Sequence, residues 1–305
     1  MKKIILIILV LASVSTYAQQ EPHYTQNQFN NYLMINPAYA GAFDKGSVAV
    51  RVRNQWTDFK GAPLTLGLNG EAKVFKDYLG VGLSVNHDRI GILTSTSADL
   101  SIGSHVRLSE QSRLGLGVKI GVNVLQTDFS KLQNVDVTDP LYLTNETATP
   151  IYLGFGLLYH NKKKNLYAGI SSPRLLSFES AGPQSKVGKP HFYGRVGYRY
   201  AFKNGIELRP GIVGKYQVHA PFQMDFALNA WYKERLGIGF SYRTGDAVTA
   251  TVQVQFKNVL VGYSYDMTVS KLRAFNTGSH EAYIGYTFGK KAEGTPDSVP
   301  SNRYF

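Results

Sequence analysis

The feature that most constrains the fold is an alternation of apolar residues with small or polar ones, which recurs from residue 46 to residue 288. In residues 112–125, SRLGLGVKIGVNVL, every second residue from Leu114 to Val124 is aliphatic, and the residues between them are glycine or polar. Successive side chains of a β-strand point to opposite faces, so this period predicts a strand with one apolar face. One such strand also fits a soluble sandwich, but its recurrence favours a transmembrane β-barrel.

The polar faces of these predicted strands carry many of the 30 glycines of the chain. Glycine weakens a strand whose face is solvated, but it suits a crowded interior where another group approaches the backbone closely. We therefore expect the apolar faces to contact lipid and the small or charged residues to line a lumen. In hydrocarbon every backbone polar group must be hydrogen-bonded within the protein, which a closed barrel achieves and an open sheet does not.

The alternation predicts an all-β fold, a transmembrane antiparallel barrel of fourteen strands, and an even number is typical of bacterial barrels. Short turns alternate with longer connections such as 126–149 and 173–188, as expected when both termini are periplasmic and the long loops are external. The predicted strands are 46–54, 63–74, 78–87, 95–108, 112–125, 150–160, 164–172, 189–201, 204–216, 221–232, 235–243, 246–256, 258–267 and 279–288.

The first residues have the features of a secretory signal peptide: Lys2 and Lys3, an apolar run, and a small-x-Ala site that ends at Ala18. The rest of the chain has no apolar run near the about 20 residues of a spanning helix. We expect export to the outer membrane of a Gram-negative cell. The expected parts are a signal peptide (1–18), an N-terminal periplasmic or plug segment (19–45), the barrel (46–288) and a mobile polar tail (289–305).

The stretch NQFNNYLMINPAYAGAFD, residues 27–44, does not alternate like a strand. Asn36-Pro37 and Gly41 are turn residues, and Tyr39 lies between them. Two interpretations stay open: residues 22–44 fold into the barrel as a partial plug, or they form a lead-in strapped across its periplasmic base. A fourteen-stranded barrel leaves a lumen wider than side chains alone readily fill. The plug or partner-binding candidates here are Asn36, Pro37, Tyr39 and Gly41.

Few residues point to catalysis. The chain has no cysteine, no His-Glu-x-x-His and no phosphate-binding loop, and Gly115–Gly121 has the wrong spacing for a dinucleotide site. Ser279 and His280 are adjacent, so in a strand they face opposite ways. The sequence therefore predicts no catalytic, cofactor or metal site. The net charge of +12 fits an anionic partner, but export and the lack of a binding motif argue against nucleic acid.

A charged cluster is predicted at the outer rim of the lumen. By alternation, Arg243, Asp266 and Glu281 lie on the lumen face of three late strands. They can form a network that fills the lumen mouth, or a contact surface for a docked or passing chain. We assign further residues to the same lumen set, namely Asp225, His280, Lys215 and Arg195.

The first outer loop, residues 54–65, carries Trp56 and Phe59 beside Gly61 and Pro63. Aromatic side chains at a membrane interface anchor a barrel. Exposed aromatic side chains in loops are also frequent hot spots of protein binding. Both interpretations of Trp56 and Phe59 stay open, and we treat the two residues as candidates for partner binding.

Several short motifs are spread along the mature chain. They are Asn36-Pro37-Ala38-Tyr39-Ala40-Gly41, Arg53-x-Gln55-Trp56-x-x-Phe59-x-Gly61-Ala62-Pro63-x-Thr65, Asp88-x-Ile90-Gly91, Gly154-Phe155-Gly156-Leu157-Leu158-Tyr159, Gly169-Ile170-Ser171, Ala220-Pro221-x-Gln223-x-Asp225, Tyr242-Arg243-x-Gly245-Asp246-Ala247, Tyr263-Ser264-Tyr265-Asp266 and Gly278-Ser279-His280-Glu281. In their order and spread they resemble those of the PorP/SprF family of type IX secretion system proteins of Bacteroidota. A small departure is Ile92, where proline is expected after Asp88-x-Ile90-Gly91.

This resemblance implies a non-enzymatic role without cofactors, in secretion or in surface attachment of exported proteins such as gliding adhesins. It implies outer-membrane lipid, secretion machinery subunits and the C-terminal domain of a secreted protein or adhesin as partners. A transporter or channel for a small solute is the first alternative. An outer-membrane enzyme that uses Ser279 or His280 is the second.

Overall fold

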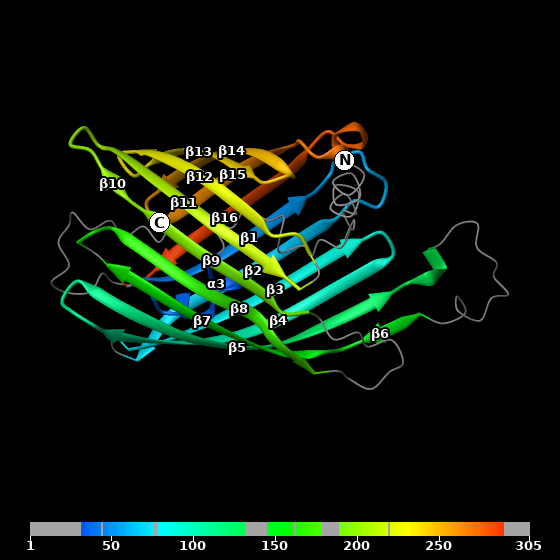
Figure 1. The fold of residues 1–305 in the computed structure, drawn as a ribbon, viewed down its shortest axis with the longest axis horizontal. Helices are drawn as coiled ribbons and strands as arrows, with labels where there is room; N and C mark the ends of the chain where they lie inside the picture. Colours follow the sequence, from blue (N-terminus) through cyan, green and yellow to red (C-terminus); the bar gives the residue numbers. More distant parts are fainter. Residues whose placement is uncertain are drawn as a thin grey trace, which may run out of the picture.

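The computed structural model describes residues 32–43, 45–75, 78–131, 145–161, 163–178, 189–218 and 220–289. In this part of the chain the strands form one antiparallel sheet that closes on itself (Figure 1). They are β1 (Gly46–Asn54), β2 (Leu64–Phe75), β3 (Leu79–Ile90), β4 (Leu93–Arg107), β5 (Ser112–Thr127), β6 (Glu146–Ala148), β7 (Ile151–Asn161), β8 (Leu166–Phe178), β9 (His191–Tyr198), β10 (Tyr200–Ala201), β11 (Ile206–Gln217), β12 (Gln223–Tyr232), β13 (Leu236–Arg243), β14 (Ala247–Phe256), β15 (Val259–Thr268) and β16 (Ser279–Phe288).

The sheet is a barrel of fourteen strands, which confirms the predicted fold class. The short β6 prolongs β7 along β5, and the short β10 prolongs β9 along β11, so neither adds a separate strand to the wall. The first and last strands pair in antiparallel register, from Gly46 opposite Phe288 to Asn54 opposite His280. Closure removes the unpaired edges that an open sheet would expose to hydrocarbon.

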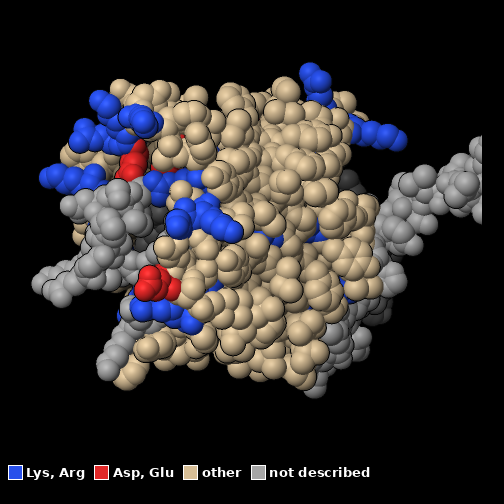
Figure 2. All heavy atoms as spheres, turned by 60° about the vertical axis from the view of Figure 1, so that its left-hand side comes forward, with Lys and Arg blue, Asp and Glu red and all other residues tan. Residues whose placement is uncertain are grey.

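Burial follows the predicted alternation. In β5, Val118 and Ile120 are about half exposed on the outer surface, whereas Lys119 between them is 3% exposed in the lumen. Exposed aliphatic and aromatic side chains recur on the outward faces of the other long strands. Figure 2 shows a broad uncharged surface with Lys and Arg gathered mostly toward its edges. An apolar belt of this extent would be unfavourable in water, so it matches a lipid-facing wall.

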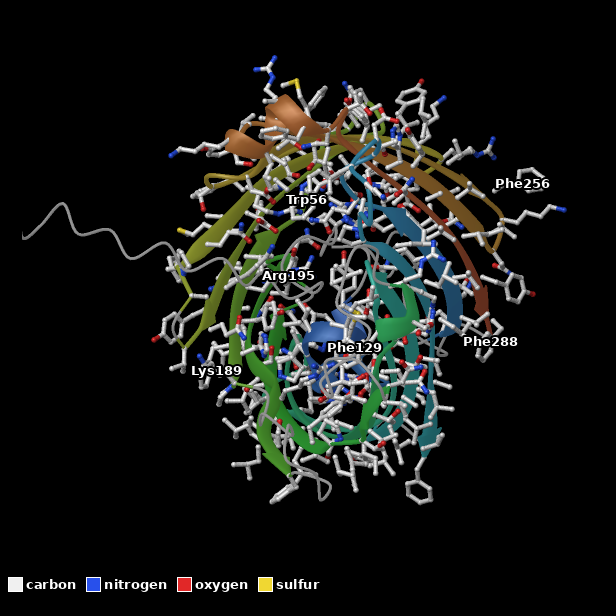
Figure 3. The ribbon with its side chains drawn as sticks, turned by 90° about the vertical axis from the view of Figure 1, so that its right-hand side faces the viewer. Trp56, Phe129, Lys189, Arg195, Phe256 and Phe288 are labelled. Carbon is white, nitrogen blue, oxygen red and sulfur yellow. The ribbon has the colours of Figure 1, made fainter. Side chains whose placement is uncertain are left out.

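Helix α3 (Tyr32–Ile35) and the 3-10 turn η2 (Pro37–Tyr39) lie inside the ring of strands, as the view along the barrel in Figure 3 shows. Every residue of both elements is buried, with η2 against β4, β5 and β7 and α3 against β2, β3 and β8. We call residues 32–43 the lumen segment. Two other short turns, η3 (Phe129–Lys131) and η5 (Lys271–Phe275), lie in the connections after β5 and β15.

The remaining sequence predictions for the termini lie outside the described residues. They are the signal peptide, residues 22–31 and 44 of the predicted plug, and all but the first residue of the tail. The division of the chain at residues 18, 45 and 288 therefore stays a prediction. Among the residues that the structure describes, none of the helices combines the length and the apolar character needed to cross a membrane.

Candidate functional site

The lumen segment rests on a row of glycines that crosses four neighbouring strands. Gly80, Gly103, Gly117 and Gly156 occupy β3, β4, β5 and β7 and are direct partners in register. An added Cβ atom at Gly117 would lie 2.1 Å from the backbone nitrogen of Ala38. At each of the other three the nearest atom of the lumen segment would be at 2.0–2.3 Å. No real Cβ contact is so short, so the seat exists only because these positions are glycine.

Hydrogen bonds from the wall hold the backbone of the lumen segment in this seat. Lys119 Nζ donates to the Met34 carbonyl at 2.8 Å, and Ser171 Oγ donates to the Ile35 carbonyl at 2.7 Å. His105 Nε2 lies 2.8 Å from the Ala40 carbonyl oxygen. These contacts satisfy backbone groups that the short helical turns leave without partners. The wall therefore binds the segment through its main chain as well as through its side chains.

Asn36 is the residue that ties the turn of the segment to the wall. Its side-chain oxygen accepts a hydrogen bond from the Ala38 nitrogen at 2.9 Å, which caps the turn that Pro37 begins. Its side-chain nitrogen donates to the Leu157 carbonyl of β7 at 3.0 Å. Gly41, near the end of the segment, has a φ of +69°, a left-handed conformation that glycine adopts without strain.

Aromatic rings complete the packing of the segment. Tyr32 and Tyr39 stack with ring centroids 5.1 Å apart, and the Arg195 guanidinium carbon lies 3.9 Å from the Tyr32 centroid. Both tyrosine rings are buried. Four of the residues predicted as plug or partner-binding candidates, Asn36, Pro37, Tyr39 and Gly41, are thus brought together inside the barrel.

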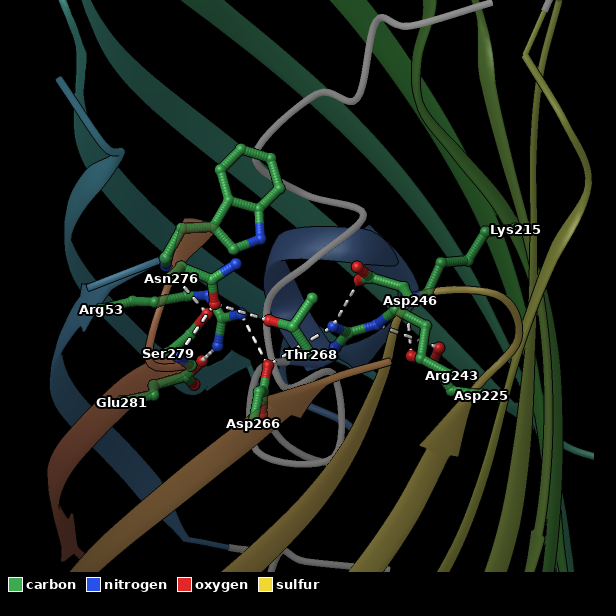
Figure 4. Close-up of polar contacts among 12 residues, drawn as sticks. Arg53, Lys215, Asp225, Arg243, Asp246, Asp266, Thr268, Asn276, Ser279 and Glu281 are labelled. Atoms are coloured by element: carbon green, nitrogen blue, oxygen red, sulfur yellow. Dashed lines mark hydrogen bonds and ion pairs between the residues drawn. The ribbon is translucent and has the colours of Figure 1, made fainter. Parts of the chain in front are cut away.

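A buried ion-pair network occupies the opposite wall near the outer rim (Figure 4). Arg53 of β1 contacts Asp266 at 2.7 Å and Glu281 at 3.1 Å. Arg243 of β13 contacts the same Asp266 oxygen at 3.4 Å, so this carboxylate joins the two arginines. The network therefore links strands from both sides of the β1–β16 junction.

The network continues along β12 and β11. Arg243 also contacts Asp225 at 3.3 Å and Asp246 at 3.1 Å, and Lys215 contacts Asp225 at 2.6 Å. All of these side chains are at least nine-tenths buried, where opposite charges must compensate one another's lost hydration. The predicted members Asp225, Arg243, Asp266 and Glu281 do lie together.

Sequence reasoning missed Arg53 and Asp246 in this network. Alternation along β1 places Arg53 on the lumen face, and it is the register partner of Glu281, so a prediction of the β1–β16 closure would have found it. The assignment of His280 to the network is wrong. As the neighbour of Glu281 in β16, His280 points to the outer surface, where its Nδ1 lies 2.5 Å from the Tyr263 hydroxyl.

The first outer loop is folded tightly onto the last connection. The backbone nitrogen of Trp56 donates to Ser279 Oγ at 3.0 Å, and the backbone nitrogen of Thr57 donates to the Gly278 carbonyl at 2.8 Å. Trp56 and Asp58 have φ values of 51° and 73°, which are uncommon for residues other than glycine and cost energy. Such strained conformations cluster where a loop must present side chains in one arrangement.

Beside this loop is a polar cleft of about 400 Å³, which includes Asn54, Asp58, Arg89 and Lys131 in its lining. Phe59 also lines the cleft and is 44% exposed. Trp56 is partly buried. Ser279, which accepts the hydrogen bond from the Trp56 backbone, lies two residues before Glu281 of the ion-pair network in the same strand, so this strand connects the loop with the network. Of the predicted pair, Phe59 lines the cleft, and the backbone of Trp56 ties the loop to Ser279.

The described residues offer surfaces for binding more clearly than for chemistry. No group of three or more histidine and acidic side chains in the described ranges is arranged to hold a metal ion. The carboxylates of the ion-pair network are engaged by arginine and lysine. What the arrangement provides is a lumen that holds a buried segment of the chain, and an outer rim with an exposed aromatic ring.

Comparison with known proteins gives a family and a fold. The family model described as "Type IX secretion system membrane protein PorP/SprF" matches residues 16–286. Among curated proteins, no match was found. The toluene transporter TbuX of Ralstonia pickettii is 12% identical, with a TM-score of 0.52 over 84% of this chain and 92% of that one.

Two further solved structures are similar. The CymD monoaromatic hydrocarbon channel is 11% identical, with a TM-score of 0.51 over 88% of this chain and 94% of that one. CdiB from Acinetobacter baumannii is 8% identical, with a TM-score of 0.45, and the match covers 80% of this chain but 60% of CdiB. At such identities the likeness to TbuX and CymD shows the barrel fold alone.

Proposed function

The chain belongs to the PorP/SprF family of type IX secretion system membrane proteins, and from this premise we propose that it is a non-enzymatic outer-membrane component of that system. In this proposal it supports secretion or surface attachment of exported proteins, such as gliding adhesins, by binding other proteins. Its partners are machinery subunits, the C-terminal domain of a secreted protein or adhesin, and the surrounding lipid.

The observation that carries the proposal is the outer rim around Phe59. A half-exposed aromatic ring beside a polar cleft, on a loop fixed by hydrogen bonds to the last connection, has the composition of an interaction hot spot. Arg89 in the cleft favours an acidic or carboxylate group on the docked domain, whereas Lys131 already pairs with Asp128 at 2.8 Å. The rigid loop lowers the entropy cost of binding.

The occupied lumen supports a binding role over conduction. The lumen segment is buried among wall residues apart from the partly buried Phe43, and charged pairs occupy the other wall. A protein that acts by binding at its two ends has no need of an open path between them. We therefore place the functional surfaces at the rims.

The test is a mild-detergent pull-down of the tagged protein from its native membrane, read by mass spectrometry. We expect recovery of machinery subunits or of one exported adhesin, and its loss in Phe59→Ala. Phe275→Ala is the matched control, because Phe275 is a 65% exposed ring in η5, outside the residues that line the cleft. Recovery of the barrel alone, with secretion intact in a deletion strain, would contradict the proposal.

A transporter or channel for a small solute is the second candidate. The similar barrels TbuX and CymD carry such descriptions, and a segment inside a barrel can act as a movable plug. For this chain, transport would require the lumen segment to leave its glycine seat. Solute-dependent conductance in a planar bilayer would favour this candidate, and its absence in both wild type and a plug-deleted variant would remove it.

A further inference from the structure

An apolar groove of about 580 Å³ runs across the outward face of the wall from β5 to β12. Its floor includes Gly194 of β9 and Gly214 of β11, which are direct partners in register. Both glycines fall on the outward face, because their neighbours Tyr193 and Val213 are buried in the lumen. The walls are larger outward side chains, among them Ile170 and Val196.

The groove is a depression in the apolar outer surface, because small residues occupy outward positions that carry large side chains elsewhere. Most outward positions of the neighbouring strands carry aliphatic or aromatic side chains that are 40–60% exposed, such as Ile212 at 42% and Val196 at 51%. An added Cβ atom at Gly194 would meet nothing within 4 Å, so the space above it is empty of protein. Arg195 also lines the groove, but its guanidinium lies over the Tyr32 ring on the lumen side.

One end of the groove lies at the β7–β8 turn and is polar and basic. Tyr159 lines the groove, and its hydroxyl lies 3.3 Å from Ser112 Oγ. Asn161 Nδ2 donates to the same Ser112 oxygen at 2.7 Å. The turn that follows carries exposed Lys163 and Lys164. The lining of the groove therefore includes a tyrosine that is bonded to a hydroxyl and near an amide group, and two exposed lysines follow in the turn.

We propose that this surface binds one anionic phospholipid of the leaflet at the turn end of the barrel. An acyl chain occupies the groove over Gly194, beside the Phe222 ring that lies 3.2 Å from an added Cβ atom at Gly214. The glycerol esters and phosphate meet the polar group around Ser112, and Lys163 and Lys164 pair with the headgroup charge. The apolar lining of the groove favours an apolar occupant, and the lysines of the adjacent turn complement the charge of a phosphate. This inference does not depend on the proposed function.

The test is lipid titration of the purified full-length protein in detergent, followed by native mass spectrometry with phosphatidylglycerol and phosphatidylcholine. We expect one saturable phosphatidylglycerol on the wild type. Gly194→Leu fills the groove and loses that lipid. Gly70→Leu is the matched control, since Gly70 is an outward glycine of β2 where an added Cβ atom has its nearest contact at an ordinary 3.4 Å.

The headgroup part of the site is tested separately. Lys163→Gln with Lys164→Gln weakens phosphatidylglycerol binding by roughly 30-fold, about fivefold for each lysine. Lys233→Gln with Lys257→Gln, at two other turns of the same end, leaves binding unchanged. Unchanged binding in either the groove or the turn variant, or equal binding of phosphatidylcholine, overturns the proposal. Heat-dependent gel migration checks each fold, and Gly194→Val replaces Gly194→Leu if the latter does not fold.

Discussion

Gly117 of the barrel wall and Ala38 of the lumen segment approach so closely that a Cβ atom at position 117 would lie 2.1 Å from the Ala38 nitrogen. The same relation holds along the row, where a Cβ atom at Gly103 would lie 2.3 Å from the Ala40 carbonyl oxygen. Wall and segment are therefore complementary at the level of backbone atoms, and a single methyl group is enough to disturb their fit.

The first prediction concerns this glycine row. Gly117→Val forces the lumen segment out of its seat, because a backbone atom cannot yield as a flexible side chain can. We expect a loss of stability of about 1–3 kcal/mol, typical of overpacking, and new protease cleavage within residues 32–43. Limited proteolysis and thermal unfolding of the refolded barrel measure both. Gly70→Val on the outward face of β2 should change neither, and a protected segment in Gly117→Val would count against the seat.

A second prediction tests whether the lumen segment blocks the barrel. Removal of residues 22–44 opens a water-filled path, because the wall opposite the ion pairs carries glycines instead of bulky side chains. Planar-bilayer recordings should show steady conductance for the deletion and closed traces for the wild type. Equal traces from both proteins would mean that other residues occlude the lumen.

The third prediction concerns the ion-pair network. Arg53→Met removes a partner of two buried carboxylates, Asp266 and Glu281, and we expect it to cost about 3–5 kcal/mol in urea unfolding. Arg273→Met, at the same end of the barrel but exposed in η5, should change stability by less than about 0.5 kcal/mol. Combining Arg53→Met with Asp266→Asn should recover part of the loss, and no recovery would argue against direct pairing.

A fourth prediction compares two neighbours in β16. Glu281→Ala breaks the buried network and should cost about 3–5 kcal/mol, whereas His280→Ala removes one hydrogen bond to Tyr263 on the outer surface and should cost about 1 kcal/mol. Urea unfolding in one lipid or detergent gives both values. Equal losses would show that His280 also contributes to the interior.

The barrel itself was predictable because its signal is local. An aliphatic residue at every second position, as from Leu114 to Val124, reports which face meets lipid, and similar alternation recurs in most of the long strands. The lumen set followed from the same parity, which is why Arg243 and Asp266 were found. His280 was misassigned because its neighbour Glu281 suggested the role, although alternation gave it the other face.

Contacts between segments far apart in the sequence were not predictable in this way. The seat of Ala38 on Gly117 depends on the register of four strands and on the path of a segment that has no period of its own. Arg53 needed knowledge of the β1–β16 pairing. Strained φ values at Trp56 and Asp58 leave no mark in residue type, because neither is glycine.

The antiparallel pairing of β1 with β16 also sets an order of assembly. Gly46 and Phe288 are partners, 288 − 46 = 242 positions apart, so this seam forms only after the last strand has been made. The lumen segment bonds to Lys119 and Ser171, which arrive much earlier. The strands up to β8 already contain both of these hydrogen-bond donors. The lumen segment can therefore bind to this part of the wall first and guide the later strands as the barrel closes around it.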